Sequence, residues 1–74
     1  MIEKIKRTLL DYVDYNPDDI TAETEFLKDL KMTSYDIITM IGEFEDEFGI
    51  TIENEDLLNI VTVGDLAQYL QKLL

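Results

Sequence analysis

The sequence predicts an all-α protein, a small four-helix bundle with three main helices, one short helix and a long first loop. Two observations predict it: apolar residues recur at helical spacing in three segments, and a hydroxyl residue followed three positions later by an acid opens two of them. The chain has 74 residues, is 46% hydrophobic, and contains three glycines and one proline. That composition is typical of a folded chain. We expect one domain over residues 1–74, close to the smallest size that one core can stabilise.

The first helix is predicted over residues 2–14, because its apolar side chains fall at helical spacing between charged ones. Asn16-Pro17 is expected to end it, since the residue before proline disfavours the α conformation. Residues 16–32 then form a long connection. Four apolar residues are expected to hold this connection against the core: Ile20, Phe26, Leu27 and Leu30. A loop of this length is unusual in so small a domain unless it has a function.

The clearest helix is predicted over residues 34–48. Its apolar stripe contains Ile37, Ile41, Phe44 and Phe48, widened by Ile38 and Met40. Gly49 follows, where a left-handed residue commonly ends a helix. Residues 54–59 are expected to form one or two helical turns. The last helix opens with T-V-G-D at 62–65, a capping box, and places Val63, Leu66, Ala67, Leu70 and Leu73 on one face.

The composition excludes several classes of function. The chain has no cysteine and no histidine, so it lacks the nucleophile pairs of many hydrolases and the ligands of a typical zinc site. We therefore expect neither an enzyme nor a metal centre. With 17 acids, 6 bases and a net charge of −11, nucleic-acid binding is disfavoured. Apolar runs are shorter than the about 20 residues of a membrane helix, and the N-terminus lacks a signal-peptide core. We expect a soluble, cytoplasmic monomer.

Ser34 is the only serine in the chain and stands at the predicted start of the 34–48 helix. A serine there most often caps the helix. Thr33 is the better cap, because Asp36 lies three residues later and completes a T-x-x-D box. Ser34 would then be the first helical residue with a spare hydroxyl. A phosphoryl group on that hydroxyl would meet free amides and the positive end of the helix dipole.

Three runs carry a family resemblance over essentially the whole chain: F-L-K-D-L-K-M-T-S-Y-D, I-x-x-F-E-D-E-F-G-I-x-I and I-V-T-V-G-D-L-A-Q-Y-L. Together they resemble the acyl carrier proteins. In that family the serine that opens the second helix bears 4′-phosphopantetheine, and the matching residue is Ser34. The family's usual Asp-Ser-Leu is Thr33-Ser34-Tyr35 in this chain. Lys31 replaces a common glycine, and Glu53 a common proline.

The resemblance implies a carrier that is modified by a phosphopantetheinyl transferase and that presents acyl intermediates to enzymes of fatty acid, polyketide or related biosynthesis. Basic patches on those enzymes would contact residues around the serine: Thr33, Tyr35, Asp36, Glu43, Asp46 and Glu47. An acyl chain would enter between helices, against matching apolar positions: Ile38, Ile52, Leu57, Ile60 and Leu66.

Two alternatives remain open from the sequence. Residues 14–25 match the calcium-loop spacing of an EF-hand at Asp14, Asn16, Asp18 and Glu25, although Asp19 stands where that loop needs glycine. The chain could also be an unmodified acidic interaction module that keeps the bundle without the arm.

Overall fold

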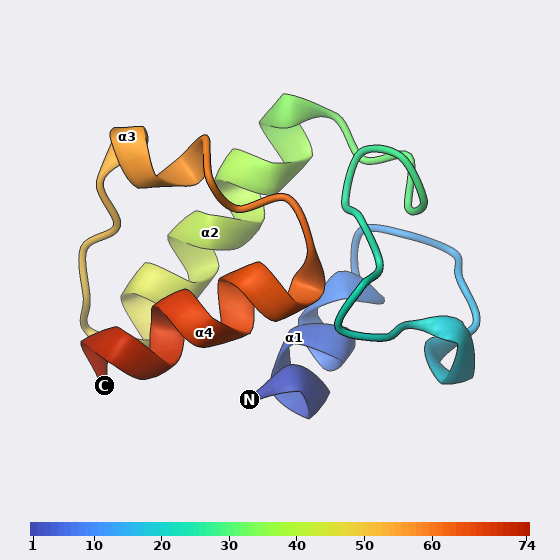
Figure 1. Ribbon diagram of the computed structural model, residues 1–74, viewed down its shortest axis with the longest axis horizontal. Coiled ribbons are helices and arrows are strands. Elements are labelled where there is room, and N and C mark those ends of the chain that lie inside the picture. The colour runs from blue at the N-terminus through green and yellow to red at the C-terminus, as the bar shows by residue number, and fades with distance from the viewer.

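The computed structural model describes residues 1–74, apart from the side chain of Asn54. Its helices are α1 (Ile2–Leu9), the short 3₁₀ turn η1 (Pro17–Asp19), α2 (Ser34–Phe48), α3 (Asn54–Leu57) and α4 (Val63–Leu73). Figure 1 shows α1, α2 and α4 as the long helices, with α3 between the end of α2 and the start of α4. The predicted all-α architecture of three main helices and one short helix is therefore confirmed.

The buried apolar residues form one continuous cluster, to which each long helix and the first loop contribute. Phe26 from the loop and Phe44 from α2 are the largest fully buried side chains. α1 packs directly against α4. Burying a side chain of this size is worth about 1.5–3 kcal/mol, so the loop contributes to the core as the helices do.

The first helix is shorter than predicted, because it ends at Leu9 and not at residue 14. The amide of Asp11 bonds to the Thr8 carbonyl and that of Tyr12 to the Leu9 carbonyl, so the chain continues in tight turns. An acid such as Asp11 near the negative end of the helix dipole opposes further helix.

Both capping boxes form as the sequence predicts. In α2, Thr33 Oγ1 accepts the Asp36 amide at 3.1 Å, and Asp36 Oδ2 accepts the Thr33 amide at 3.2 Å. In α4, Thr62 and Asp65 exchange the same two bonds, both at 3.1 Å. Gly49, at φ 65°, ends α2 in the left-handed region. These contacts fix where the two best-defined helices begin.

The long first loop is held by backbone hydrogen bonds that the sequence did not predict. The Val63 amide bonds to the Thr24 carbonyl at 2.9 Å, and the Gly64 amide to the Ala22 carbonyl at 2.8 Å. Because the first amides of a helix have no partner within it, the loop satisfies α4 at its open end. Ile20, Phe26 and Leu30 are buried as expected, whereas Leu27 is 57% exposed. Leu27 therefore does not pin the loop to the core, and that expectation was wrong.

The close approach of Ala22 to Gly64 predicts a large effect of one methyl group. A Cβ on Gly64 would lie 2.9 Å from the Ala22 carbonyl oxygen. We expect Gly64→Ala to lower the free energy of unfolding by about 1–3 kcal/mol, measured by urea denaturation. Gly42, inside α2, is the matched control, because a Cβ there meets nothing within 4 Å. Gly42→Ala should raise stability by about 0.5–1 kcal/mol. Equal effects at the two glycines would contradict this account.

Candidate functional site

Ser34 is the first residue of α2, and its side chain is exposed. Thr33 caps the helix, as the sequence predicts, so the cap does not use the serine. The side-chain hydrogen bonds at this end of α2 join Thr33 to Asp36, and among the described residues none involves the Ser34 hydroxyl. The serine oxygen is therefore free to form a covalent bond.

The start of α2 also offers free hydrogen-bond donors. Thr33 accepts the amides of Asp36 and Ile37 through its hydroxyl and its carbonyl. The amides of Ser34 and Tyr35 lie before the first intrahelical bond and have no acceptor among the described residues. Such amides, with the helix dipole, favour an anionic group. The carboxylate of Asp36 opposes an anion, although one of its oxygens is bonded to the Thr33 amide.

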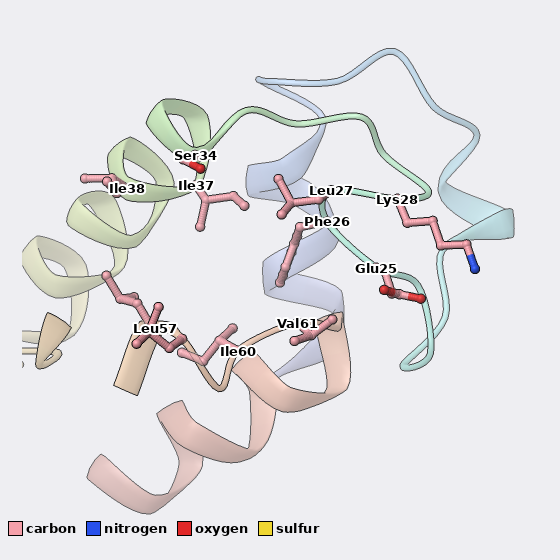
Figure 2. Close-up of a pocket in the computed structure, with 11 residues that line it drawn as sticks. Glu25, Phe26, Leu27, Lys28, Ser34, Ile37, Ile38, Leu57, Ile60 and Val61 are labelled. Carbon is pink, nitrogen blue, oxygen red and sulfur yellow. The ribbon is translucent and has the colours of Figure 1, made fainter. Parts of the chain in front are cut away.

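A pocket of about 560 Å³ opens beside Ser34. This volume falls in the range of small-ligand sites, roughly 300–1,000 Å³. Figure 2 shows Ser34 at its rim, with Ile37 on α2 and Leu57 reaching toward the space from the other side. Eleven residues line it: Glu25, Phe26, Leu27, Lys28, Ser34, Ile37, Ile38, Leu57, Leu58, Ile60 and Val61.

The pocket includes some of the apolar positions taken from the resemblance and leaves out others. Ile38, Leu57 and Ile60 line it. Ile52 and Leu66 are buried in the core and do not line it. The pocket residues from the first loop, together with Ile37, Leu58 and Val61, were not foreseen at this site. The one available signal was the run from Leu57 to Val61, which holds more apolar residues than a single helical turn can bury.

The acids of α2 mostly have partners within the chain. Glu43 accepts the Tyr12 hydroxyl at 2.7 Å, Glu47 lies 2.9 Å from the Lys4 amino group, and Glu45 accepts the Ile52 amide at 2.8 Å. The Lys4 amino group also lies 5.4 Å from the centre of the Phe48 ring. Asp46 is exposed. Two of the four acids expected to meet partner enzymes, Glu43 and Glu47, are thus bonded toward α1 and the segment after it.

The bond to Glu43 raises the pKa of Tyr12 to about 12, with smaller contributions from burial of the hydroxyl and from nearby negative charge. The folded state therefore binds the tyrosine proton more tightly than the unfolded state, in which the pKa is close to its ordinary value of 10.0. The stabilisation is complete below about pH 10 and is lost as the pH rises to about 12.

The acidic side chains of the first loop do not converge on a calcium site. Asn16 Oδ1 accepts the Asp18 amide at 3.0 Å and caps η1, so one residue of the proposed EF-hand spacing is already bonded. Within the part of the chain that the structure describes, no three acidic side chains converge on a point that could hold a metal ion. Nor does any described helix combine the length and apolar character needed to cross a membrane.

Lys31 has a left-handed backbone with φ 59°, three residues before Ser34. This conformation is strained for a residue with a Cβ and is relaxed for glycine. The chain reverses here between the buried side chains of Leu30 and Met32. The strain therefore lies in the segment that positions the serine.

The site fits a serine-linked phosphodiester. The Ser34 oxygen is exposed and unbonded, the amides of Ser34 and Tyr35 have no acceptor at the same end of the helix, and an apolar pocket begins beside them. Two comparisons agree with this geometry. The family model described as "Phosphopantetheine attachment site" matches residues 3–70. Among solved structures, the acyl carrier protein from Enterococcus faecalis is similar, with 31% identity and a TM-score of 0.80. The match covers 92% of this chain and 86% of that one.

Replacing Lys31 with glycine should relieve the strain. We expect Lys31→Gly to raise the free energy of unfolding by about 0.5–1 kcal/mol, after allowing for the greater freedom of glycine in the unfolded state. Lys31→Ala is the matched control, because it removes the charge and keeps the strain. A glycine variant no more stable than the alanine variant in urea denaturation would show that φ is not the cause.

Tyr12→Phe should abolish one pH-dependent part of the stability. We expect the variant to be less stable than the wild type by about 0.5–1.5 kcal/mol at neutral pH. That difference should shrink between about pH 10 and pH 12, the interval set by the raised pKa of Tyr12. Urea denaturation of both proteins across this interval measures it. A difference that stays constant with pH would contradict the hydrogen bond to Glu43.

Proposed function

The chain belongs to the family of phosphopantetheine-bearing acyl carrier proteins, and from this membership we propose that Ser34 is the residue that bears the arm. Proteins of this family carry 4′-phosphopantetheine covalently and are not enzymes themselves. The observation that supports Ser34 is its exposed hydroxyl at the first position of α2, which the Thr33 cap leaves unbonded. No other serine is present in the chain.

A phosphopantetheinyl transferase is needed for the attachment. The chain has no histidine, and a serine hydroxyl without an adjacent base is a weak nucleophile. The Ser34 oxygen bonds to the phosphorus that bears pantetheine in coenzyme A, while the bond from that phosphorus to the adenosine bisphosphate breaks. The serine proton passes to a base of the transferase, and adenosine 3′,5′-bisphosphate leaves.

The chain's own contribution is to hold and present the arm. The free amides of Ser34 and Tyr35 face the new phosphodiester, and such an anion at a helix start is typically stabilised by about 0.3–1 kcal/mol. The thiol of the attached arm holds an acyl group as a thioester. The pocket beside Ser34 is suited to an apolar part of that cargo, with Ile38, Leu57 and Ile60 in its wall. Fatty acyl and polyketide intermediates both contain apolar hydrocarbon parts.

The charge of the chain supports a role in meeting several enzymes in turn. The net charge of −11 attracts proteins with basic patches and speeds their encounter. The contacts it provides are weakened by salt, which suits a carrier that must leave each enzyme. We include in the partner surface the half-buried Asp36 and five exposed residues: Thr33, Tyr35, Glu43, Asp46 and Glu47. The same charge opposes self-association, so the chain should act as a monomer, with residues 1–74 as the carrier unit.

Modification in vitro tests this proposal. We expect the chain to gain the mass of one phosphopantetheine when incubated with coenzyme A and a transferase of broad specificity, measured on the intact protein. Ser34→Ala should gain nothing and should melt at the wild-type temperature, because Thr33 keeps the cap. Arm addition to the alanine variant would refute Ser34 as the site. An unmodified wild type would favour the unmodified interaction module.

A further inference from the structure

The short helix α3 and the residues that follow it form part of the wall of the pocket beside Ser34. Leu57, the last residue of α3, lines that pocket together with Leu58 and Ile60. Figure 2 shows Leu57 and Ile60 across the pocket from Ile37 of α2. The position of α3 therefore sets how wide the pocket is.

α3 has little of its own structure to hold it in place. It is a single turn, Asn54–Leu57, and no side chain caps its start. Its backbone hydrogen bonds join residues three positions apart within the segment 53–60. Leu58, directly after the helix, is 83% exposed. A short element with little buried surface is among the parts of a fold that move most easily.

The segment that contains α3 is fixed at both of its ends. Before α3, the Ile52 amide donates to Glu45 Oε2 at 2.8 Å. After it, the Val61 amide donates to Asp65 Oδ2 at 3.1 Å. Residues 53–60 therefore span two fixed points, and their middle is the part that can shift.

A side-chain hydrogen bond joins that middle to α4. The Tyr69 hydroxyl donates to Asp56 Oδ2 at 2.5 Å, a short distance that is typical of a bond to a charged oxygen. The bond to Asp56 raises the pKa of Tyr69, so the hydroxyl keeps its proton at neutral pH. Among the described residues, no other side chain of α3 is hydrogen-bonded to another helix. We call the bond between Asp56 and Tyr69 the α3 latch.

α3 also has space beside it. A second hollow, of about 310 Å³, is lined by both partners of the latch and by Ile60. Ile60 lines the pocket beside Ser34 as well, so it stands between the two spaces. A shift of Ile60 and α3 toward the second hollow would widen the pocket. The latch opposes such a shift, because it fixes the distance between α3 and α4.

We propose that the α3 latch sets the length of the acyl chain that the pocket admits, with Tyr69 as a positioning residue that acts through α3. The inference rests on the proposed attachment at Ser34 and deepens it. Tyr69 does not line the pocket, so it cannot act by touching the cargo there. With the latch closed, Leu57 and Ile60 bound a pocket of about 560 Å³. With the latch broken, this wall moves back and a longer apolar chain is buried.

The experiment loads the intact chain with saturated acyl groups of increasing length, from butyryl to palmitoyl in even-numbered steps. The transferase uses each acyl-coenzyme A in the same exchange at Ser34, which releases adenosine 3′,5′-bisphosphate. Thermal melting reports where the cargo lies, because each methylene buried only in the folded state should raise Tm by about 3–6 °C. Tm should rise with cargo length and stop rising at the length that fills the pocket.

Tyr69→Phe removes the hydroxyl of the latch and keeps the ring that packs against the core. The unloaded variant should melt at a lower temperature than the wild type. The longest cargo that still raises Tm should be at least one step of the series longer. Asp56→Ala should give the same longer limit, whereas Asp56→Asn, which keeps an acceptor, should stay closer to the wild type. Combining Tyr69→Phe with Asp56→Ala should not move the limit further, because both changes remove one bond.

Tyr12→Phe is the matched control. It also removes a tyrosine hydroxyl that is bonded to a carboxylate, that of Glu43, but neither residue lines the pocket. This variant should melt at a lower temperature with every cargo and keep the cargo limit of the wild type. If Tyr69 only stabilised the fold, Tyr69→Phe would behave in the same way, and that result would overturn the proposal.

The outcomes separate this proposal from the attachment at Ser34. A wild type that gains no arm overturns the attachment and the latch with it. A wild type that gains the arm but melts at the same temperature with every cargo leaves the attachment standing and overturns the latch. A cargo limit that is unchanged or shorter in Tyr69→Phe also overturns the latch alone.

Discussion

The arrangement of the site depends on the contact between the first loop and the start of α4. The amides of Val63 and Gly64 must find acceptors, because a helix cannot satisfy its own first turn. The carbonyls of Thr24 and Ala22 supply them. This contact holds residues 25–28 next to Val61, and these residues form one wall of the pocket. The closeness of Ala22 to Gly64 is possible only because residue 64 has no side chain.

The first loop also leads into α2 in a way that leaves the Ser34 hydroxyl exposed and unbonded. Phe26, Leu30 and Met32 are buried, and the turn at Lys31 lets the chain leave the core and begin α2. Thr33 then caps the helix, which leaves Ser34 as an exposed first helical residue. Had the serine been the cap, its oxygen would have been bonded to the amide of the third helical residue. Thr33 therefore caps the helix, and the Ser34 hydroxyl stays available for the attachment that we propose.

The sequence predicted the elements whose ends are marked by local chemistry. The T-x-x-D pattern at Thr33 and the T-V-G-D pattern at 62–65 gave the starts of α2 and α4, and Gly49 gave the end of α2. The end of α1 was wrong, because apolar spacing continues past Leu9 although the backbone does not. Local patterns could not reveal the bonds from Ala22 and Thr24 to α4, since these join residues about 40 positions apart.

The candidate site was predicted less completely than the fold. The better cap at Thr33 left the Ser34 hydroxyl spare, and the resemblance then pointed to Ser34 as the modified residue. It also gave Ile38, Leu57 and Ile60, which line the pocket. Leu27 was expected in the core, and the part of the pocket wall formed by residues 25–28 was not predicted. Apolar identity alone does not distinguish a residue buried in the core from one at the rim of a pocket. The partners of Glu43 and Glu47 also required the folded structure, because Tyr12 and Lys4 are distant in sequence.

We propose that Ser34 bears the arm in the cell. The most direct test is mass spectrometry of the protein purified from its native host, first intact and then as peptides that separate Ser34 from the neighbouring threonines. We expect one phosphopantetheine, located on Ser34. A native protein with an unmodified Ser34, or with the arm on another residue, would contradict it.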